Sequence, residues 1–290
     1  TKKYFIDNIL SSLNIDFQKS NLLNLVNLDG EKTIYTSTES TPFLLSLIVN
    51  QTNDQAFVVV ENNEIAKKIF QDCQSFLGPN YPIFYIPEIE THPMSGLEKN
   101  SISLAERNDA LSRVIELNAK PSLTFLSAFS LAQKIPEKKY FYNSFLDLKV
   151  GQNLEISKLI NKLIKYGYKR THTVESLGEF SVRGSLIDIF SAGQELPIRV
   201  DFYEEFIDGI RVFDPVTQRT VGRQNNLIIR AIDYQNINNI SEGSITDLIG
   251  NSSCFVQINP KSSGNLVNHY KERYTQKGID NFLFDWKEIN

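Results

Sequence analysis

The chain has 290 residues, of which 41% are hydrophobic and 22% charged, so it is an ordinary globular protein long enough for two domains. Its formal net charge of −4 gives the whole chain no electrostatic footprint for nucleic acid. The two cysteines, Cys73 and Cys254, are too far apart for a disulfide framework or a zinc-binding pattern, and no run is apolar enough to cross a membrane. We therefore expect a cytoplasmic protein without a metal site.

The first 134 residues alternate between helical and strand patterns. Residues 55–60 form an apolar run that is typical of a buried parallel strand. Thr41 is expected to cap the helix over 43–49, with Pro42 in its first turn. Such alternation predicts a parallel α/β sheet with helices on its faces. Helices are expected over 4–13, 43–49, 64–77, 102–117 and 128–134, and strands over 32–35, 55–60, 82–86 and 122–126.

Residues 138–151 are mixed in character and are expected to form a linker. The most regular helical pattern of the chain follows over 153–166, and Gly167 is expected to end it. Its apolar residues recur at intervals of three and four, which places them on one helical face. They are Ile156, Leu159, Ile160, Leu163 and Ile164.

A small antiparallel sheet is expected between residues 178 and 229. Asp208-Gly209 is its expected hairpin turn, and 210–213 and 227–229 are further strands, the last one closing the sheet. After a polar linker from residue 234, a buried type of strand is expected over 253–258 and a helix over 266–276.

This sheet is expected to have two unlike faces, because successive side chains on a strand point to opposite sides. The apolar residues of its strands would pack under the helix over 153–166. Arg183, Arg199 and Tyr203 would project from the other face, and arginine and tyrosine dominate the hot spots of protein interfaces. The alternative interpretation is that these side chains belong to an ordinary solvated outer face.

Catalytic chemistry has little support in the sequence. Asp188, Asp201 and Asp208 lie on predicted strands and turns, where solvated or ion-paired acids are the norm. Asp201 is expected on the same face as Arg199, where a surface pair would contribute only about 0–1 kcal/mol. There is no GxSxG, HExxH or GxGxxG motif, and His92 and His172 have no partners at the spacing of a triad or a metal site. We expect no catalytic, cofactor-binding or metal-binding residues.

The run from Gly167 to Thr220 contains FSVRG, PIRVDFY and RVFDPVTQRT. It resembles the UvrA-binding domain that bacterial transcription-repair coupling factors share with the excision-repair protein UvrB, and RVFDPVTQRT favours the coupling factors. The resemblance implies that Arg183, Arg199 and Tyr203 contact UvrA. Tyr203 departs from the phenylalanine of the family pattern, but it keeps an aromatic ring.

The resemblance also implies the domain organisation. Residues 1–140 and 234–290 would form a degenerate helicase-like parallel α/β domain, truncated in this chain. Residues 141–233 would be an inserted small α+β domain, an antiparallel sheet plus a helix, that binds UvrA. The loop from Thr36 to Thr41 lies where helicase relatives carry a phosphate-binding loop, but it has neither glycine nor lysine. We therefore expect a UvrA-recruiting module that does not hydrolyse nucleotide.

Full-length members of this family are ATP-dependent DNA translocases. Their motor domains use ATP and magnesium, and further C-terminal domains bind RNA polymerase and DNA and mask the UvrA-binding surface. Two alternatives stay open. One is a fragment of a UvrB-type ATP-dependent excision-repair helicase subunit. The other is a DNA-binding module that uses Lys158, Lys162 and Lys165, although a row of lysines on one helix face is usually solvated.

Overall fold

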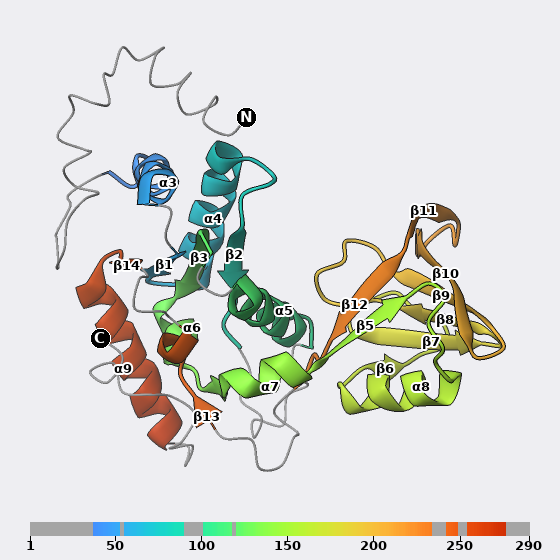
Figure 1. Cartoon of the computed structure of the whole chain (residues 1–290). Helices are drawn as coiled ribbons and strands as arrows, with labels where there is room; N and C mark the ends of the chain where they lie inside the picture. The colour runs from blue at the N-terminus through green and yellow to red at the C-terminus, as the bar shows by residue number, and fades with distance from the viewer. Residues whose placement is uncertain are drawn as a thin grey trace, which may run out of the picture. The chain divides into compact units, whose positions relative to one another are not determined.

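The computed structural model describes residues 37–52, 55–89, 101–117, 120–233, 242–248 and 254–276. The helix and strand expected over 4–13 and 32–35 and His92 lie outside these ranges. The chain divides into two compact units (Figure 1). Unit 1 comprises residues 1–86, 117–133 and 245–290, and unit 2 comprises residues 87–116 and 134–244.

Unit 1 is built on a sheet of four strands in the order β14-β1-β3-β2, and every neighbouring pair is parallel. All residues of β1 and β3 are buried, because both faces of a parallel sheet are covered. The expected parallel α/β arrangement is confirmed, while its helicase-like character stays a prediction. The strands are β1 (Gln55–Val60), β2 (Ile83–Ile86), β3 (Ser122–Ser127) and β14 (Cys254–Gln257).

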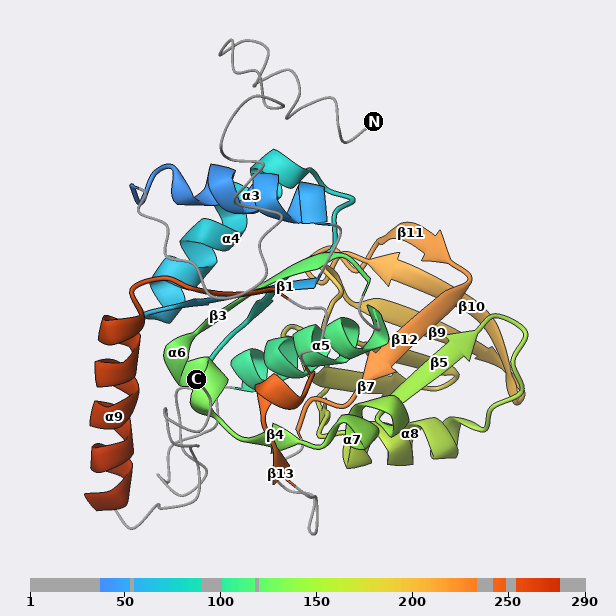
Figure 2. The ribbon, with the colours of Figure 1, turned by 60° about the vertical axis from the view of Figure 1, so that its left-hand side comes forward.

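Helices cover both faces of this sheet: α3 and α4 lie above it in Figure 2, and α6 lies below it. Thr41 is the first residue of α3 and donates its Oγ1 hydrogen to the Ser37 carbonyl (2.9 Å), so the expected capping role is wrong. Cys73 is buried, and burial raises the pKa of its thiol to about 12, as befits an inert core cysteine. The helices are α3 (Thr41–Thr52), α4 (Asn63–Leu77), α6 (Ala128–Ala132), the 3-10 helix η1 (Ile245–Leu248) and α9 (Pro260–Gln276).

Unit 2 contains a sheet of six strands in the order β11-β10-β9-β8-β7-β6, antiparallel except for the pair β6 and β7. Helix α8 (Ile156–Lys165) packs Leu159 and Leu163 on its apolar face, as expected, whereas Ile164 is 56% exposed. The strands are β6 (Lys169–Arg170), β7 (Glu179–Arg183), β8 (Leu186–Ile189), β9 (Ile198–Tyr203), β10 (Phe206–Phe213) and β11 (Thr220–Gln224).

Helix α8 ends where the sequence predicts. Gly167 has φ +89°, a left-handed conformation that favours glycine, and the Gly167 and Tyr168 amides donate to the Ile164 and Leu163 carbonyls. A Cβ at this position would lie only 2.8 Å from the Asp233 Cβ. Both backbone conformation and close packing therefore require glycine here.

The prediction of a linker over residues 138–151 is wrong, because this segment contains α7 (Lys138–Asn143) and β5 (Phe145–Lys149). Strand β5 pairs with β12 (Asn226–Arg230), so the strand expected to close the sheet lies in a separate ribbon and β11 is the edge strand. Leu148 is buried by this pairing, which joins segments far apart in sequence. A second short ribbon pairs β4 (Ile135–Pro136) with β13 (Glu242–Gly243).

The hairpin between β9 and β10 turns earlier than expected. Tyr203 pairs with Phe206, so Glu204 and Glu205 form the turn, and Glu204 has φ +55°. The register then shifts between Ile207 and Gly209, which makes Asp208-Gly209 a β-bulge within β10 rather than a turn.

Helix α5 (Ser101–Leu117) belongs to unit 2, although its sequence pattern places it among the elements of the first sheet. Asn108 donates from Nδ2 to the carbonyls of Ala231 (3.3 Å) and Ile232 (3.0 Å). Arg230 donates to Asp109 (3.1 Å) and to Glu116 (2.7 Å). These polar contacts hold α5 against the end of β12.

Candidate protein-binding face

The register of the six-stranded sheet places four polar residues of neighbouring strands in one row. Ser181 pairs with Asp188, Asp188 with Arg199, and Arg199 with Arg211. Residues directly opposite each other on antiparallel strands point to the same face. Alternation along β7 and β9 adds three more residues to that face: Arg183, Asp201 and Tyr203. We call this side of the sheet, opposite the apolar core under α8, the polar face.

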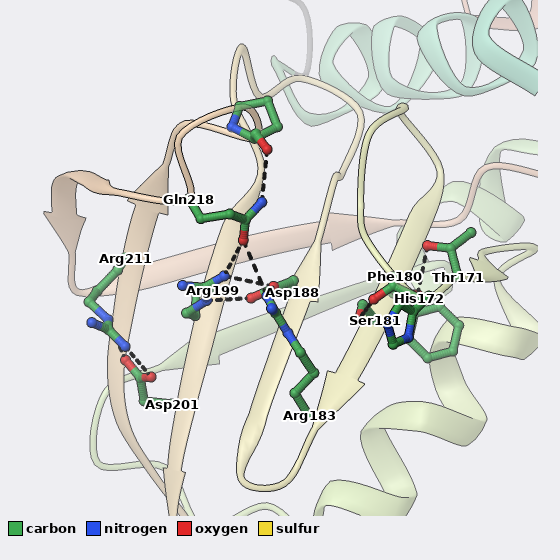
Figure 3. A network of polar contacts seen from close by, with 11 residues as sticks. Thr171, His172, Phe180, Ser181, Arg183, Asp188, Arg199, Asp201, Arg211 and Gln218 are labelled. Atoms are coloured by element: carbon green, nitrogen blue, oxygen red, sulfur yellow. Dashed lines mark hydrogen bonds and ion pairs between the residues drawn. The ribbon is translucent and has the colours of Figure 1, made fainter.

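Asp188 is the centre of the polar face (Figure 3). Its Oδ1 accepts a hydrogen bond from Arg199 Nε (2.6 Å), and its Oδ2 accepts one from Arg199 Nη2 (2.8 Å) and another from Arg183 Nη2. The side chain is only 2% exposed because the two guanidinium groups cover it. One buried carboxylate therefore joins two of the three predicted site residues.

Arg199 is mostly covered. Its side chain is 12% exposed, and its guanidinium carbon lies 4.4 Å from the centroid of the buried Phe213 ring, within the range of a cation–π contact. Its Nη2 also donates to Gln218 Oε1 (3.0 Å). The hydrogen bond to Asp188 raises the pKa of the Arg199 guanidinium. Arg199 is therefore a charged side chain that its contacts with Asp188, Gln218 and Phe213 fix in position.

Arg183 is the more accessible of the two arginines, with 44% of its side chain exposed. Its Nη2 donates to Gln218 Oε1 (3.3 Å) as well as to Asp188. Tyr203 is 69% exposed on the same face. The structure therefore leaves one arginine and one tyrosine of the predicted trio open to solvent.

Gln218 reaches the arginines from the turn between β10 and β11. It has φ +59°, and its Nε2 donates to the Pro215 carbonyl (2.8 Å). Asp214 Oδ1 closes this turn by accepting from the amides of Val216 (3.0 Å) and Thr217 (2.7 Å). These bonds lower the pKa of the Asp214 carboxyl. The turn segment of RVFDPVTQRT thus folds back so that one glutamine oxygen caps both arginines.

Asp201 lies on the same face as Arg199, as expected, but its ion pair is with Arg211. Asp201 accepts from Arg211 Nε (2.6 Å) and Nη2 (2.5 Å), while Arg199 uses Asp188. Arg199 and Arg211 are directly opposite each other, an arrangement that is unfavourable for like charges unless each has its own acid. The two carboxylates provide that compensation.

Sequence reasoning missed three residues of this face. It treated Asp188 only as one of several solvated or ion-paired acids, and it assigned no role to Gln218 or Phe206. Phe206 is 46% exposed and pairs with Tyr203 across the turn, so two aromatic residues lie opposite each other on the same face. The role of Asp188 could have been predicted from the sequence. Alternation along β8 places its side chain on the same face of the sheet as the arginines of the neighbouring strands.

The structure gives less support to the other functional sites that the sequence suggested. Among the described residues, no group of three or more His, Cys, Asp or Glu side chains is placed to hold a metal ion. Ser181 Oγ donates to the His172 carbonyl (2.9 Å). Lys158 pairs with Glu155 (3.5 Å), and Lys162 Nζ lies 5.4 Å from the Tyr166 ring centroid, so the lysine row is a solvated helix surface. In the described part of the chain, no helix is long and apolar enough to span a membrane.

Comparison with known proteins identifies a domain that contains this face. Residues 146–233 match the family described as the UvrB interaction domain, which includes all of the polar face. The transcription-repair-coupling factor of Rickettsia typhi is 27% identical over 243 residues, covering 84% of this chain and 20% of the relative. That of Bacillus subtilis is 27% identical and that of Haemophilus influenzae 30% identical, over 64% and 61% of this chain.

The chain spans 16% of the Bacillus subtilis relative and 15% of the Haemophilus influenzae relative, so the similarity concerns one part of a much longer protein. Within that part, the match includes the strands, the turn and the charged residues described above. Residues 146–233 are therefore similar to the UvrB interaction domain, and most of the chain is similar to one part of transcription-repair-coupling factors.

Proposed function

We propose that this chain recruits UvrA through the polar face of unit 2 and thereby links transcription to nucleotide excision repair. The observation that carries this proposal is the exposure of Arg183 and Tyr203 on one face of a UvrB interaction domain. Arginine and tyrosine combine charge with large apolar area, which is the composition of interface hot spots. The names of the similar proteins support the connection with transcription and repair.

In the proposed complex, the positive charge of Arg183 and Arg199 faces acidic groups of UvrA, and the Tyr203 ring supplies buried apolar area. In longer relatives we propose that other domains bind RNA polymerase and DNA, and that one of them covers the polar face until the motor acts. This chain is then the recruiting part, and the chemistry of ATP hydrolysis belongs to those other domains.

Replacing Arg183 with alanine should weaken UvrA binding by about 2 kcal/mol or more, which is about 30-fold in Kd. The reason is that truncation removes the more exposed of the two arginines bound to Asp188. Calorimetric titration of the folded chain with purified UvrA measures the effect. Higher salt should also slow association of the parent chain, because charge steers the encounter.

Arg170→Ala is the matched control for this titration. Arg170 is exposed on β6, and its register partner is Phe180, so it lies off the polar face. The Arg170→Ala variant should bind UvrA with the same affinity as the parent chain. Equal affinities for the parent and Arg183→Ala would refute the proposed role of the polar face.

We also propose that the chain does not hydrolyse nucleotide. Residues 37–41 form a short turn in which Ser37 Oγ accepts from the Ser40 amide (3.2 Å), and the segment contains no glycine or lysine to cradle a phosphate. Titration with a fluorescent ATP analogue and Mg²⁺ should show no saturable binding up to about 1 mM. Micromolar binding would instead favour a fragment of a UvrB-type ATP-dependent helicase subunit.

A further inference from the structure

We propose that Asp188 is a positioning residue for UvrA binding: with Gln218 it fixes the guanidinium group of Arg183 in its docking orientation. Arg199 then acts mainly by holding Asp188 and filling the space over Phe213. This inference rests on the proposed function, and it assigns separate roles to two arginines that the sequence treats alike.

The first argument is the occupancy of the Asp188 carboxylate. Three arginine N–H groups converge on its two oxygens, and only 2% of the side chain is exposed. A group in this position has no surface to offer a partner. Its charge can act on docking only through Arg183 and Arg199.

The second argument is the difference between the two arginines. Arg199 uses Nε and Nη2 within the domain, stacks on Phe213 and is 12% exposed. In the hydrogen bonds found among the described residues, Arg183 uses only Nη2, and 44% of its side chain is exposed. Arg183 therefore has more N–H donors and more exposed surface to offer a partner carboxylate than Arg199 has.

The third argument is the double fixing of Arg183. Its Nη2 lies between the Asp188 carboxylate and the Gln218 amide oxygen, which come from β8 and from the turn after β10. Gln218 is itself held by its bond to the Pro215 carbonyl. A long arginine side chain that is ordered before binding loses less conformational entropy when the complex forms.

The net charge of this cluster also limits the partner. Two guanidinium groups and one carboxylate leave a single positive charge at Asp188. The cluster thus fits one acidic side chain of UvrA, received by Arg183, rather than a separate acid for each arginine.

Asp188→Asn separates positioning from simple charge complementarity, because the two predict opposite results. Removing the carboxylate raises the local positive charge, which by itself would tighten binding to an acidic partner. If Asp188 positions Arg183, the loss of the negative charge and of one acceptor oxygen should instead raise the Kd for UvrA by about tenfold. Calorimetric titration with purified UvrA measures this, and thermal unfolding followed by circular dichroism shows that the variant is folded.

Asp201→Asn is the matched control. It removes the same charge from the same face, but Asp201 binds Arg211 and makes no hydrogen bond with Arg183 or Arg199. This variant should keep the parent affinity within about twofold.

A double-mutant cycle tests whether Asp188 acts through Arg183. In an Arg183→Ala background, Asp188→Asn should change the Kd by less than about twofold, since the group to be positioned is gone. A merely structural role would lower affinity equally in both backgrounds. Gln218→Met is the second variant: it keeps the length of the side chain, removes the acceptor oxygen and should raise the Kd by about threefold.

Each outcome has a distinct meaning. A parent chain that does not bind UvrA overturns the proposed function and this inference together. If the parent binds and folded Asp188→Asn binds equally well or more tightly, the positioning role fails while the proposed function stands. If Asp188→Asn does not fold, parent-like affinity of folded Gln218→Met overturns the positioning role.

Discussion

Replacing Arg230 with methionine should lower the free energy of unfolding of unit 2 by about 3–5 kcal/mol, because it removes the buried partner of the Asp109 carboxylate. Arg230 is 8% exposed and donates to Asp109 (3.1 Å) and Glu116 (2.7 Å) of α5. Native-state hydrogen exchange of the β5 and β12 amides, together with urea unfolding, measures the loss.

The effect should depend on pH with a defined sign. Burial raises the pKa of the Asp109 carboxyl, although Arg113 and Arg230 oppose the shift. A carboxyl with a raised folded-state pKa contributes stability that is complete below its unfolded pKa and is lost as pH rises through the folded pKa. Without Arg230 this penalty grows, so Arg230→Met should be most destabilised near neutral pH and least in acid.

Arg113→Met is the control for this experiment. Arg113 pairs with the same Asp109 (2.8 Å), but its side chain is 40% exposed, so solvent screens the pair. The expected loss is about 0–1 kcal/mol. Equal losses for the two variants would contradict the view that the buried position of Arg230 makes it essential.

Phe180→Ala should lower the free energy of unfolding of the same unit by about 3–5 kcal/mol. Phe180 is fully buried in the core between the six-stranded sheet and α8. It lies on β7, three residues before Arg183 and on the opposite face of the sheet. Urea unfolding followed by circular dichroism measures the stability.

Val182→Ala is the matched control, since Val182 lies on the same strand and the same face but is only partly buried. Its loss should be about 1 kcal/mol, because fewer contacts and a smaller cavity are involved. A Phe180→Ala loss no larger than that of Val182→Ala would mean that Phe180 is not central to this core.

Several features of this protein are determined by the sequence alone, because their patterns act within one segment. The apolar run of β1 predicts a strand buried on both sides, and the structure confirms it. The spacing of Leu159 and Leu163 predicts the face of α8 that covers the sheet. Alternation along β7 and β9 places Arg183, Arg199 and Tyr203 on one side.

Only the tertiary structure decided which groups meet on that side. The choice of Asp188 rather than Asp201 as the partner of Arg199 follows from the register of three strands. The reach of Gln218 follows from a turn that folds back over the sheet. The same holds for β5, which is stable only beside β12, and for α5, which Arg230 ties to unit 2. Periodicity reports which face a side chain occupies, but pairing depends on contacts between segments far apart in sequence, and these form only when the whole unit packs.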